Sequence, residues 1–262
     1  MLIESARDYA SMSSIGASLI FSDAMERISK GERYNLGLAT GNTMIDLYDQ
    51  LAAKFNAAHA DLSLLSTWNL DEYSLDGSAA VPHVHPLSYW RYMHEKLFSK
   101  FDPELGFDEA NAHFPDPASP DSYDPAIAAA GGLDLQLLGI GFNGHIAFNE
   151  PMREDEISVE AFGALPTRVL PLAKETIEQN TRITADGDSS LVPRHAATMG
   201  MAPILAAKKC LLLACFKEQT VPLAAIAARG GEPTPFLPAS YLWRHGDFRL
   251  VYTEDMGVYP FS

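Results

Sequence analysis

Short apolar runs alternate with longer segments of helical periodicity along the 262 residues of the chain. The apolar runs predict β-strands at residues 34–39, 64–70, 133–140, 210–215 and 249–253. In two of these runs apolar residues follow one another without interruption, which is typical of strands that helices cover on both faces. Apolar residues at helical spacing predict helices at residues 8–30, 43–58, 86–101, 201–208 and 218–229. This alternation predicts an α/β fold of the Rossmann-like, doubly wound type, with a mostly parallel sheet and helices on both faces.

Two segments lack such a pattern. Residues 102–123 are rich in Pro, Asp and Ala, and residues 151–167 begin acidic and continue with small residues and a proline. Irregular segments of this length are often lids or binding loops. Because the composition, 47% hydrophobic and 20% charged, is that of an ordinary globular protein, we expect a single domain over residues 1–262.

The net charge of the chain is -15. Such a charge repels polyanions, so we expect no nucleic-acid partner and no anionic membrane surface. A small anionic substrate would need a local group of cations or backbone amides that overrides this field. The eight histidines show no spacing typical of a zinc site.

The two cysteines, Cys210 and Cys215, lie five positions apart in one predicted strand. Their side chains would therefore point to opposite faces and could not form a disulfide, and unpaired thiols are typical of a reducing compartment. Residues 1–3 are apolar, but charged residues begin at Glu4, unlike a signal peptide. No apolar run approaches the length of a membrane span. We therefore expect a cytoplasmic protein.

Polar residues follow the predicted strands at the edge of the sheet where ligands bind in parallel α/β proteins. After the first strand come Thr40, Gly41, Asn42 and Thr43, and then a helix begins. Hydroxyl groups, a glycine and the free amides of a helix start can hold an anion. The same four residues would also serve as a plain turn between strand and helix.

Ionisable residues follow three further strands. Asp71 and Glu72 come after the second strand and suit either proton transfer or a helix cap. His145 and Glu150 lie in a Gly-rich segment after the third strand, and together they can form an oriented base. A histidine in such a loop is untypical of a core residue, which favours a functional role. Lys217 follows the fourth strand and either reaches an anion or simply begins a helix.

Four segments resemble the motifs of the glucosamine-6-phosphate deaminase (isomerase) family, part of the glucosamine/galactosamine-6-phosphate isomerase superfamily. They read GLATGNT at residues 37–43, WNLDEY at 68–73, HPLSY at 85–89 and LGIGFNGHIAFNEP at 138–151. The resemblance extends from about residue 8 to about residue 245. The lactonase relatives of this family typically carry a DERxVP-like segment and a GHTASLFP-like loop, and this chain has neither.

The resemblance implies that glucosamine 6-phosphate and water give fructose 6-phosphate and ammonia, as part of amino-sugar metabolism and without a cofactor or metal. It implies that Asp71 carries the proton between C2 and C1 of the sugar. It also implies that His145, oriented by Glu150, opens the pyranose ring. The residues that would hold the phosphate are Thr40, Gly41, Asn42, Thr43, Arg182 and Lys217.

One position departs from the family pattern, because Asn143 stands where the GxDGH segment has an aspartate. An amide can orient His145 but cannot take a proton, and the loss of a negative charge weakens the basicity of the imidazole. Three interpretations stay open at this point: a deaminase-isomerase acting on glucosamine or galactosamine 6-phosphate, a 6-phosphogluconolactonase-like hydrolase, and a non-catalytic sugar-phosphate sensor. The carboxylates at Asp71 and Glu72 argue against the hydrolase. The sequence distinguishes neither a monomer from a homo-oligomer nor an allosteric from a non-allosteric enzyme.

Overall fold

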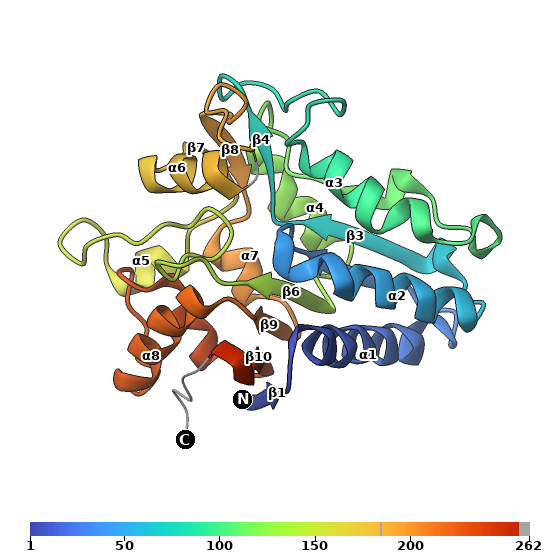
Figure 1. The fold of residues 1–262 in the computed structure, drawn as a ribbon. Coiled ribbons are helices and arrows are strands. Elements are labelled where there is room, and N and C mark those ends of the chain that lie inside the picture. The colour runs from blue at the N-terminus through green and yellow to red at the C-terminus, as the bar shows by residue number, and fades with distance from the viewer. Residues whose placement is uncertain (184, 257–262) are drawn as a thin grey trace.

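A seven-stranded sheet, in which every neighbouring pair is parallel, forms the centre of the computed structural model, which describes residues 1–183 and 185–256 (Figure 1). The strand order is β1-β10-β9-β6-β2-β3-β5. The strands span β1 Leu2–Ala6, β2 Tyr34–Leu38, β3 Leu65–Asn69, β5 Ala112–His113, β6 Leu135–Gly139, β9 Cys210–Ala214 and β10 Phe248–Thr253. All five predicted strands are present, and the predicted α/β fold is confirmed. The sequence pattern missed β1 and β5, which lie at the edges and carry no continuous apolar run.

Helices cover both faces of this sheet. α1 (Tyr9–Ile28) and α2 (Ile45–Ala57) pack side by side on one face, and α4 (Tyr123–Ala129) and α7 (Met201–Leu205) lie on the other (Figure 1). The contact of α1 with its neighbours is close, since a Cβ atom on Gly16 would lie 2.7 Å from Leu47. The other predicted helices appear as α3 (Tyr89–Lys96) and α8 (Thr220–Ala228).

A second sheet, which the sequence pattern did not predict, lies beyond the ends of β3 and β6 (Figure 1). It is antiparallel, with the order β4-β8-β7, and consists of β4 (Asp71–Ser74), β7 (Arg168–Pro171) and β8 (His195–Thr198). It packs with α6 (Lys174–Ile183) over a small apolar cluster of its own. The strands have only four residues each, and β4 (DEYS) and the helix (KETIEQNTRI) are mostly polar, so these elements carry little apolar periodicity.

Of the two segments predicted as loops, one is irregular in the structure and the other contains a helix. Residues 102–122 contain only short 3₁₀ turns and the two-residue strand β5, and Tyr123 begins α4, so the predicted irregular character is confirmed for all but the last residue of the segment. Residues 151–167 include the short helix α5 (Val159–Gly163), so the prediction of a continuous loop was wrong there. Ser158 caps this helix by accepting a hydrogen bond from the amide of Ala161, and the buried Phe162 anchors it.

Leu70 joins the two sheets and places the chain that follows it. Its amide donates to the carbonyl of Leu38 in β2, and its carbonyl accepts from the amide of Met199, just after β8. Asp71 therefore begins β4 at the carboxyl end of the parallel sheet. Both cysteines are free thiols, as predicted. Within the described ranges, no helix combines the length and apolar character needed to cross a bilayer.

Candidate active site

A cavity of about 550 Å³ opens where the two sheets meet, at the carboxyl ends of β2, β3 and β6. The structure brings seven of the predicted site residues to its wall: Thr40, Gly41, Asn42, Thr43, Asp71, His145 and Arg182. Asn143 and Glu150 lie behind His145 and contact one another and the histidine. Lys217 is exposed and does not line the cavity, although its neighbours Phe216 and Glu218 do.

The adjacent carboxylates Asp71 and Glu72 have separate environments. Glu72 accepts hydrogen bonds from the amides of Tyr89 and Trp90, both at 2.9 Å, and from the Ser88 hydroxyl. It therefore caps the start of α3 rather than facing the cavity. Asp71 lines the cavity, is only 6% exposed, and meets no hydrogen-bond donor in the described part of the chain. Burial, together with the charge of Glu72, raises the pKa of Asp71 well above its usual range.

Glu150 holds the histidine of the site from behind. Its Oε2 lies 3.4 Å from His145 Nδ1, within charge contact although not in hydrogen-bond alignment, and accepts a hydrogen bond from Asn143 Nδ2 at 2.7 Å. Its Oε1 accepts from the hydroxyl of Thr176 in α6 at 2.5 Å. Burial alone would raise the pKa of Glu150, but His145, Thr176 and Asn143 outweigh burial and lower it to about 2. Glu150 is thus a fixed negative charge.

Asn143 performs a second task in the same loop, because its Oδ1 accepts a hydrogen bond from the amide of His145 at 3.1 Å. One amide side chain therefore positions both the histidine and its carboxylate partner. An aspartate at this position could accept from the His145 amide, but it could not donate to Glu150 while ionised. The asparagine fits the arrangement observed.

The Gly-rich loop owes its path to close packing. A Cβ atom on Gly141 would overlap the ring of His145, so only glycine lets the imidazole lie against the backbone here. Ala147 has a φ of 53°, in the left-handed region that non-glycine residues rarely adopt. The buried Asn149 fixes this turn by donating to the carbonyls of Ile146 and Met199. Much of the HIAFNEP segment therefore shapes the loop rather than facing the cavity.

The segment Thr40–Thr43 also lines the cavity and leads into α2 through a 3₁₀ turn. Gly41 has a φ of 132°, which favours glycine. Its carbonyl accepts a hydrogen bond from the hydroxyl of Tyr92 at 2.7 Å, and the carbonyl of Asn42 accepts one from Tyr9 at 2.9 Å. With these two carbonyls bound from the protein side, the backbone amides of the segment can bind an anion.

Several cavity residues were not predicted from the sequence. Tyr89 donates to the hydroxyl of Tyr73 at 3.1 Å, and Asn180 of α6 donates to the same hydroxyl at 2.7 Å. These contacts, with that of Thr176 on Glu150, tie α6 to both sides of the cavity. Tyr73 and Tyr89 lie in the recognised WNLDEY and HPLSY segments and could have been found there. Thr176 and Asn180 carry no comparable signal because their helix lacks an apolar stripe.

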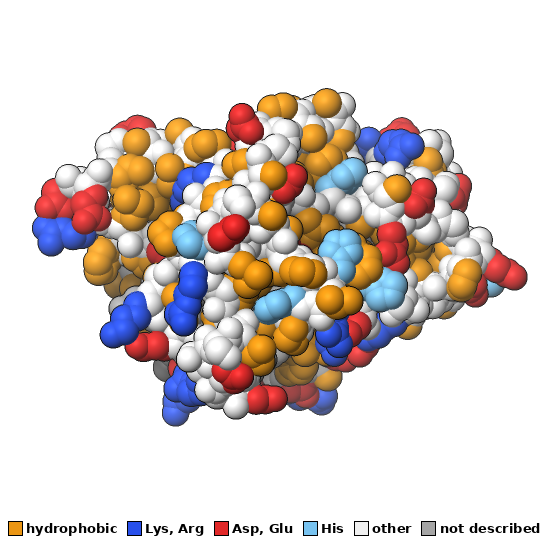
Figure 2. Space-filling model, turned by 90° about the horizontal axis from the view of Figure 1, so that it is seen from above, with side chains coloured by type: hydrophobic (Ala, Val, Ile, Leu, Met, Phe, Trp, Pro, Cys, Tyr) orange, Lys and Arg blue, Asp and Glu red, His pale blue; other side chains and the backbone are white. Residues whose placement is uncertain are grey.

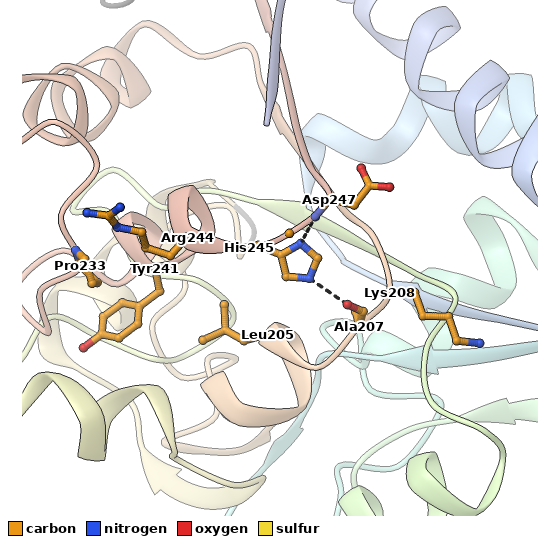
Figure 3. A pocket seen from close by; sticks show the side chains of 9 residues that line it. Leu205, Ala207, Lys208, Pro233, Tyr241, Arg244, His245 and Asp247 are labelled. Carbon is orange, nitrogen blue, oxygen red and sulfur yellow. Dashed lines mark hydrogen bonds between the residues drawn. The ribbon is translucent and has the colours of Figure 1, made fainter.

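A second cavity, of about 460 Å³, lies away from this chemistry near the end of α7 (Figure 3). Two of its charged groups have partners, since Lys208 pairs with Asp134 and Arg244 pairs with Glu232. His245 contacts the carbonyl of Ala207 through Nε2 and accepts the amide of Asp247 through Nδ1 (Figure 3). Lys208, Arg244 and His245 therefore make contacts within the fold.

On the face seen from above, hydrophobic and histidine side chains are prominent in the middle, and Lys and Arg side chains are scattered singly or in small groups (Figure 2). This distribution differs from the continuous basic surface of nucleic-acid-binding proteins. In the ranges that the structure describes, no three His, Cys, Asp or Glu side chains converge as metal ligands would.

Comparison with known proteins gives consistent results. Residues 7–156 match the sequence profile of the family described as glucosamine-6-phosphate isomerases/6-phosphogluconolactonase. The glucosamine-6-phosphate deaminase of Rhodopirellula baltica is 37% identical over 96% of this chain and 93% of its own length. Glucosamine-6-phosphate deaminase 2 of Bacillus subtilis is 36% identical over 96% of this chain and 94% of its own length.

Solved structures agree with the sequence relatives. A monomeric glucosamine-6-phosphate deaminase superposes with a TM-score of 0.82 at 28% identity, covering 98% of both chains. The 6-phosphogluconolactonase from Trypanosoma cruzi superposes with a TM-score of 0.70 at 18% identity, covering 97% of this chain and 95% of that one. The second similarity concerns the fold alone.

Proposed function

Because this chain belongs to the family of glucosamine-6-phosphate isomerases and 6-phosphogluconolactonases, and its near-full-length relatives are glucosamine-6-phosphate deaminases, we propose that it converts glucosamine 6-phosphate and water to fructose 6-phosphate and ammonia. The observation that carries this proposal is the pairing of two different proton carriers on one cavity. Asp71 faces it as a carboxyl group that meets no hydrogen-bond donor among the described residues, and His145 faces it with a fixed carboxylate behind the ring.

The first chemical step is ring opening, for which His145 is suited. Its Nδ1 faces Glu150, which leaves Nε2 for the sugar. The imidazole takes the proton from the O1 hydroxyl and delivers a proton to O5, so that the C1–O5 bond breaks and the open-chain aldehyde forms. The negative charge of Glu150 stabilises the imidazolium in between, while Asn143 keeps the loop in register.

The second step is proton transfer between carbons, for which Asp71 is suited. Its ionised carboxylate removes the proton from C2 while the ammonium group on C2 releases a proton to O1, giving an enolamine, and it then returns its proton to C1, giving the protonated imine at C2. Water then hydrolyses the imine to the ketone and releases ammonia. A carboxylate that burial makes more basic than usual is a better acceptor for a carbon-bound proton.

In this proposal the phosphate is bound by the donors of Thr40, Gly41, Asn42 and Thr43 and by the guanidinium of Arg182, all of which line the cavity. The family resemblance adds Lys217 to this set as a further prediction. The reaction needs no cofactor, since the sugar's own amine supplies the imine. Two free thiols support action in a reducing compartment such as the cytoplasm.

The proposal is tested by incubating the purified protein with glucosamine 6-phosphate and measuring ammonia and fructose 6-phosphate separately. We expect both products in equal amounts. Galactosamine 6-phosphate and 6-phosphogluconolactone serve as parallel substrates, since the first differs only at C4 and the second requires hydrolysis alone. Turnover of the lactone with none of glucosamine 6-phosphate would contradict the proposal, and so would binding of glucosamine 6-phosphate without any product.

A further inference from the structure

The cavity must hold a phosphoryl group that carries roughly −1.5 to −2 charges at pH 7, in a chain whose net charge is -15. Local cations must therefore supply the attraction. Among the described residues that line the cavity, Lys96 and Arg182 are the only lysine and arginine. Lys96 lies on α3, and none of the recognised sequence motifs places a phosphate-binding lysine or arginine on this helix.

The position of Lys96 follows from three contacts along α3 and the turn after it. Tyr89 contacts Thr40, and Tyr92 donates a hydrogen bond to the carbonyl of Gly41. Beyond the end of the helix, Lys100 pairs with Asp49 of α2. Lys96 is one turn after Tyr92 on the same side of the helix, and it lines the cavity together with Thr43 at the entry to α2.

The charge of Lys96 is not used elsewhere in the described part of the chain. Lys96 is half-buried and forms no ion pair there, whereas Lys100, four residues later, pairs with Asp49. Lys217 is exposed at the start of a 3₁₀ turn and lies outside the cavity wall. A purely structural role remains as the alternative for Lys96, because a cation in the last turn of a helix complements the helix dipole.

We infer that Lys96 is a phosphate-binding residue of this site and that, with Arg182 and the Thr40–Thr43 segment, it supplies the cation expected of Lys217. This inference rests on the proposed function for the identity of the ligand as a sugar phosphate. Its physical content is independent of turnover, since it concerns only the binding of a phosphoryl group.

The expected effect separates binding from chemistry. The phosphoryl group takes no part in proton transfer at C1 and C2, so its contacts act equally on the ground state and the transition state. Loss of one charge-assisted hydrogen bond weakens binding roughly 10- to 100-fold. Lys96→Met should therefore raise the Kd for fructose 6-phosphate and the KM for glucosamine 6-phosphate by that factor, with kcat changed less than about threefold.

The experiment is calorimetric titration of fructose 6-phosphate and of inorganic phosphate into the wild type and four variants. Lys96→Met should weaken both ligands, and Lys96→Arg should restore most of the affinity because it keeps the charge. Lys100→Met is the matched control, since it removes the same charge four residues away and should leave the affinity within about twofold of the wild type. Lys217→Met tests the competing assignment directly. Thermal unfolding of each variant shows that it is folded.

The inference is overturned if Lys96→Met raises the Kd less than fivefold, or if Lys217→Met raises it more than Lys96→Met does. A loss of thermal stability in Lys96→Met with unchanged affinity would assign the residue to the helix end alone. Failure of the proposed function would give another result: the wild type would make neither ammonia nor fructose 6-phosphate, while its binding of phosphate could still depend on Lys96.

Discussion

Asp71 is a buried carboxyl group that lines the cavity and Glu150 is a half-buried one behind His145, and their proton affinities are shifted in opposite directions. Asp71 meets no hydrogen-bond donor in the described ranges, and burial followed by the charge of Glu72 raises its pKa well above the usual range. Glu150, 19% exposed, is contacted by His145, Asn143 and Thr176, and its pKa falls to about 2. Burial alone therefore does not decide the charge of a carboxyl group, and the donors around it do.

The difference divides the chemistry between the two regions. A carboxyl group without partners can take and release a proton during the reaction, which suits Asp71 as the carrier between C2 and C1. A carboxylate held ionised by several donors cannot, but it can orient and stabilise an imidazolium, which suits Glu150 behind His145. Substitutions at or next to Asp71 and Glu150 change one of these two environments at a time.

The largest effect is expected from Asp71→Asn, which removes the proton carrier while keeping its shape. We expect kcat to fall about 10³- to 10⁴-fold with the Kd for fructose 6-phosphate nearly unchanged, because the amide cannot accept the C2 proton. A residual kcat above about one tenth of the wild-type value would show that another group carries the proton.

The same variant should also reveal the cost of a charge without partners. The pKa of Asp71 is raised in the folded state, so its favourable contribution is present below the unfolded value of about 4 and is lost as pH rises through the folded value. Asp71→Asn should therefore have a Tm equal to or above that of the wild type at pH 8, with the advantage gone at pH 4. A lower Tm at pH 8 would contradict the environment described for Asp71.

The next largest effect is expected from Glu150→Gln. Turnover should fall about 10²-fold, because the imidazolium loses its counter-charge and the new NH₂ group faces the donors of Thr176 and Asn143. The folded-state pKa of Glu150 is lowered, so its stabilisation is present above the unfolded value of about 4.3 and is lost as pH falls through about 2. The Tm deficit of the variant should therefore shrink between pH 5 and pH 2. Glu26→Gln, at an exposed position far from the cavity, serves as the control.

A smaller effect is expected from Asn143→Asp, which places a second carboxylate against Glu150. The hydrogen bond from Nδ2 is lost and two like charges face each other, so the pKa of Glu150 should rise from about 2. We expect the acid limb of the kcat profile to move to higher pH, with kcat at pH 8 within about tenfold of the wild type. Asn143→Ala removes the same bond without adding charge and should move the limb less. Equal shifts in both variants would contradict this account.

The smallest effect is expected from Glu72→Gln, which removes the charge next to Asp71. The acid limb of kcat/KM should move to lower pH by less than about one unit, since burial is the larger cause of the raised pKa of Asp71. Glu72 also caps α3, so Tm should fall. Ser88→Ala removes one donor to Glu72 and should lower Tm without moving the limb. If the acid limb of kcat/KM does not move in Glu72→Gln, the charge of Glu72 does not contribute to the raised pKa of Asp71.

The parallel sheet and several site positions followed from the sequence because their signals are local. A buried strand such as β9 is a continuous apolar run. Each recognised segment is an unbroken stretch of sequence, and one of these segments contains Asp71 and another contains His145. The three-stranded sheet and α6 did not follow, because polar residues such as Thr176 gain meaning only from the partner they meet across the cavity. The distinction between Asp71 and Glu72 also depends on such a partner, since only the position of α3 decides which carboxylate is capped.

Transfer of the C2 hydrogen tests the central claim most directly. Glucosamine 6-phosphate deuterated at C2 is converted by the wild type in ordinary water, and the deuterium at C1 of the fructose 6-phosphate is measured by mass spectrometry early in the reaction. If one carboxyl group moves the proton in a cavity that excludes water, we expect slower turnover than with unlabelled substrate and part of the deuterium retained at C1. Full-speed turnover of the labelled sugar by Asp71→Asn, with the same retention at C1, would contradict the assignment of Asp71 as the proton carrier.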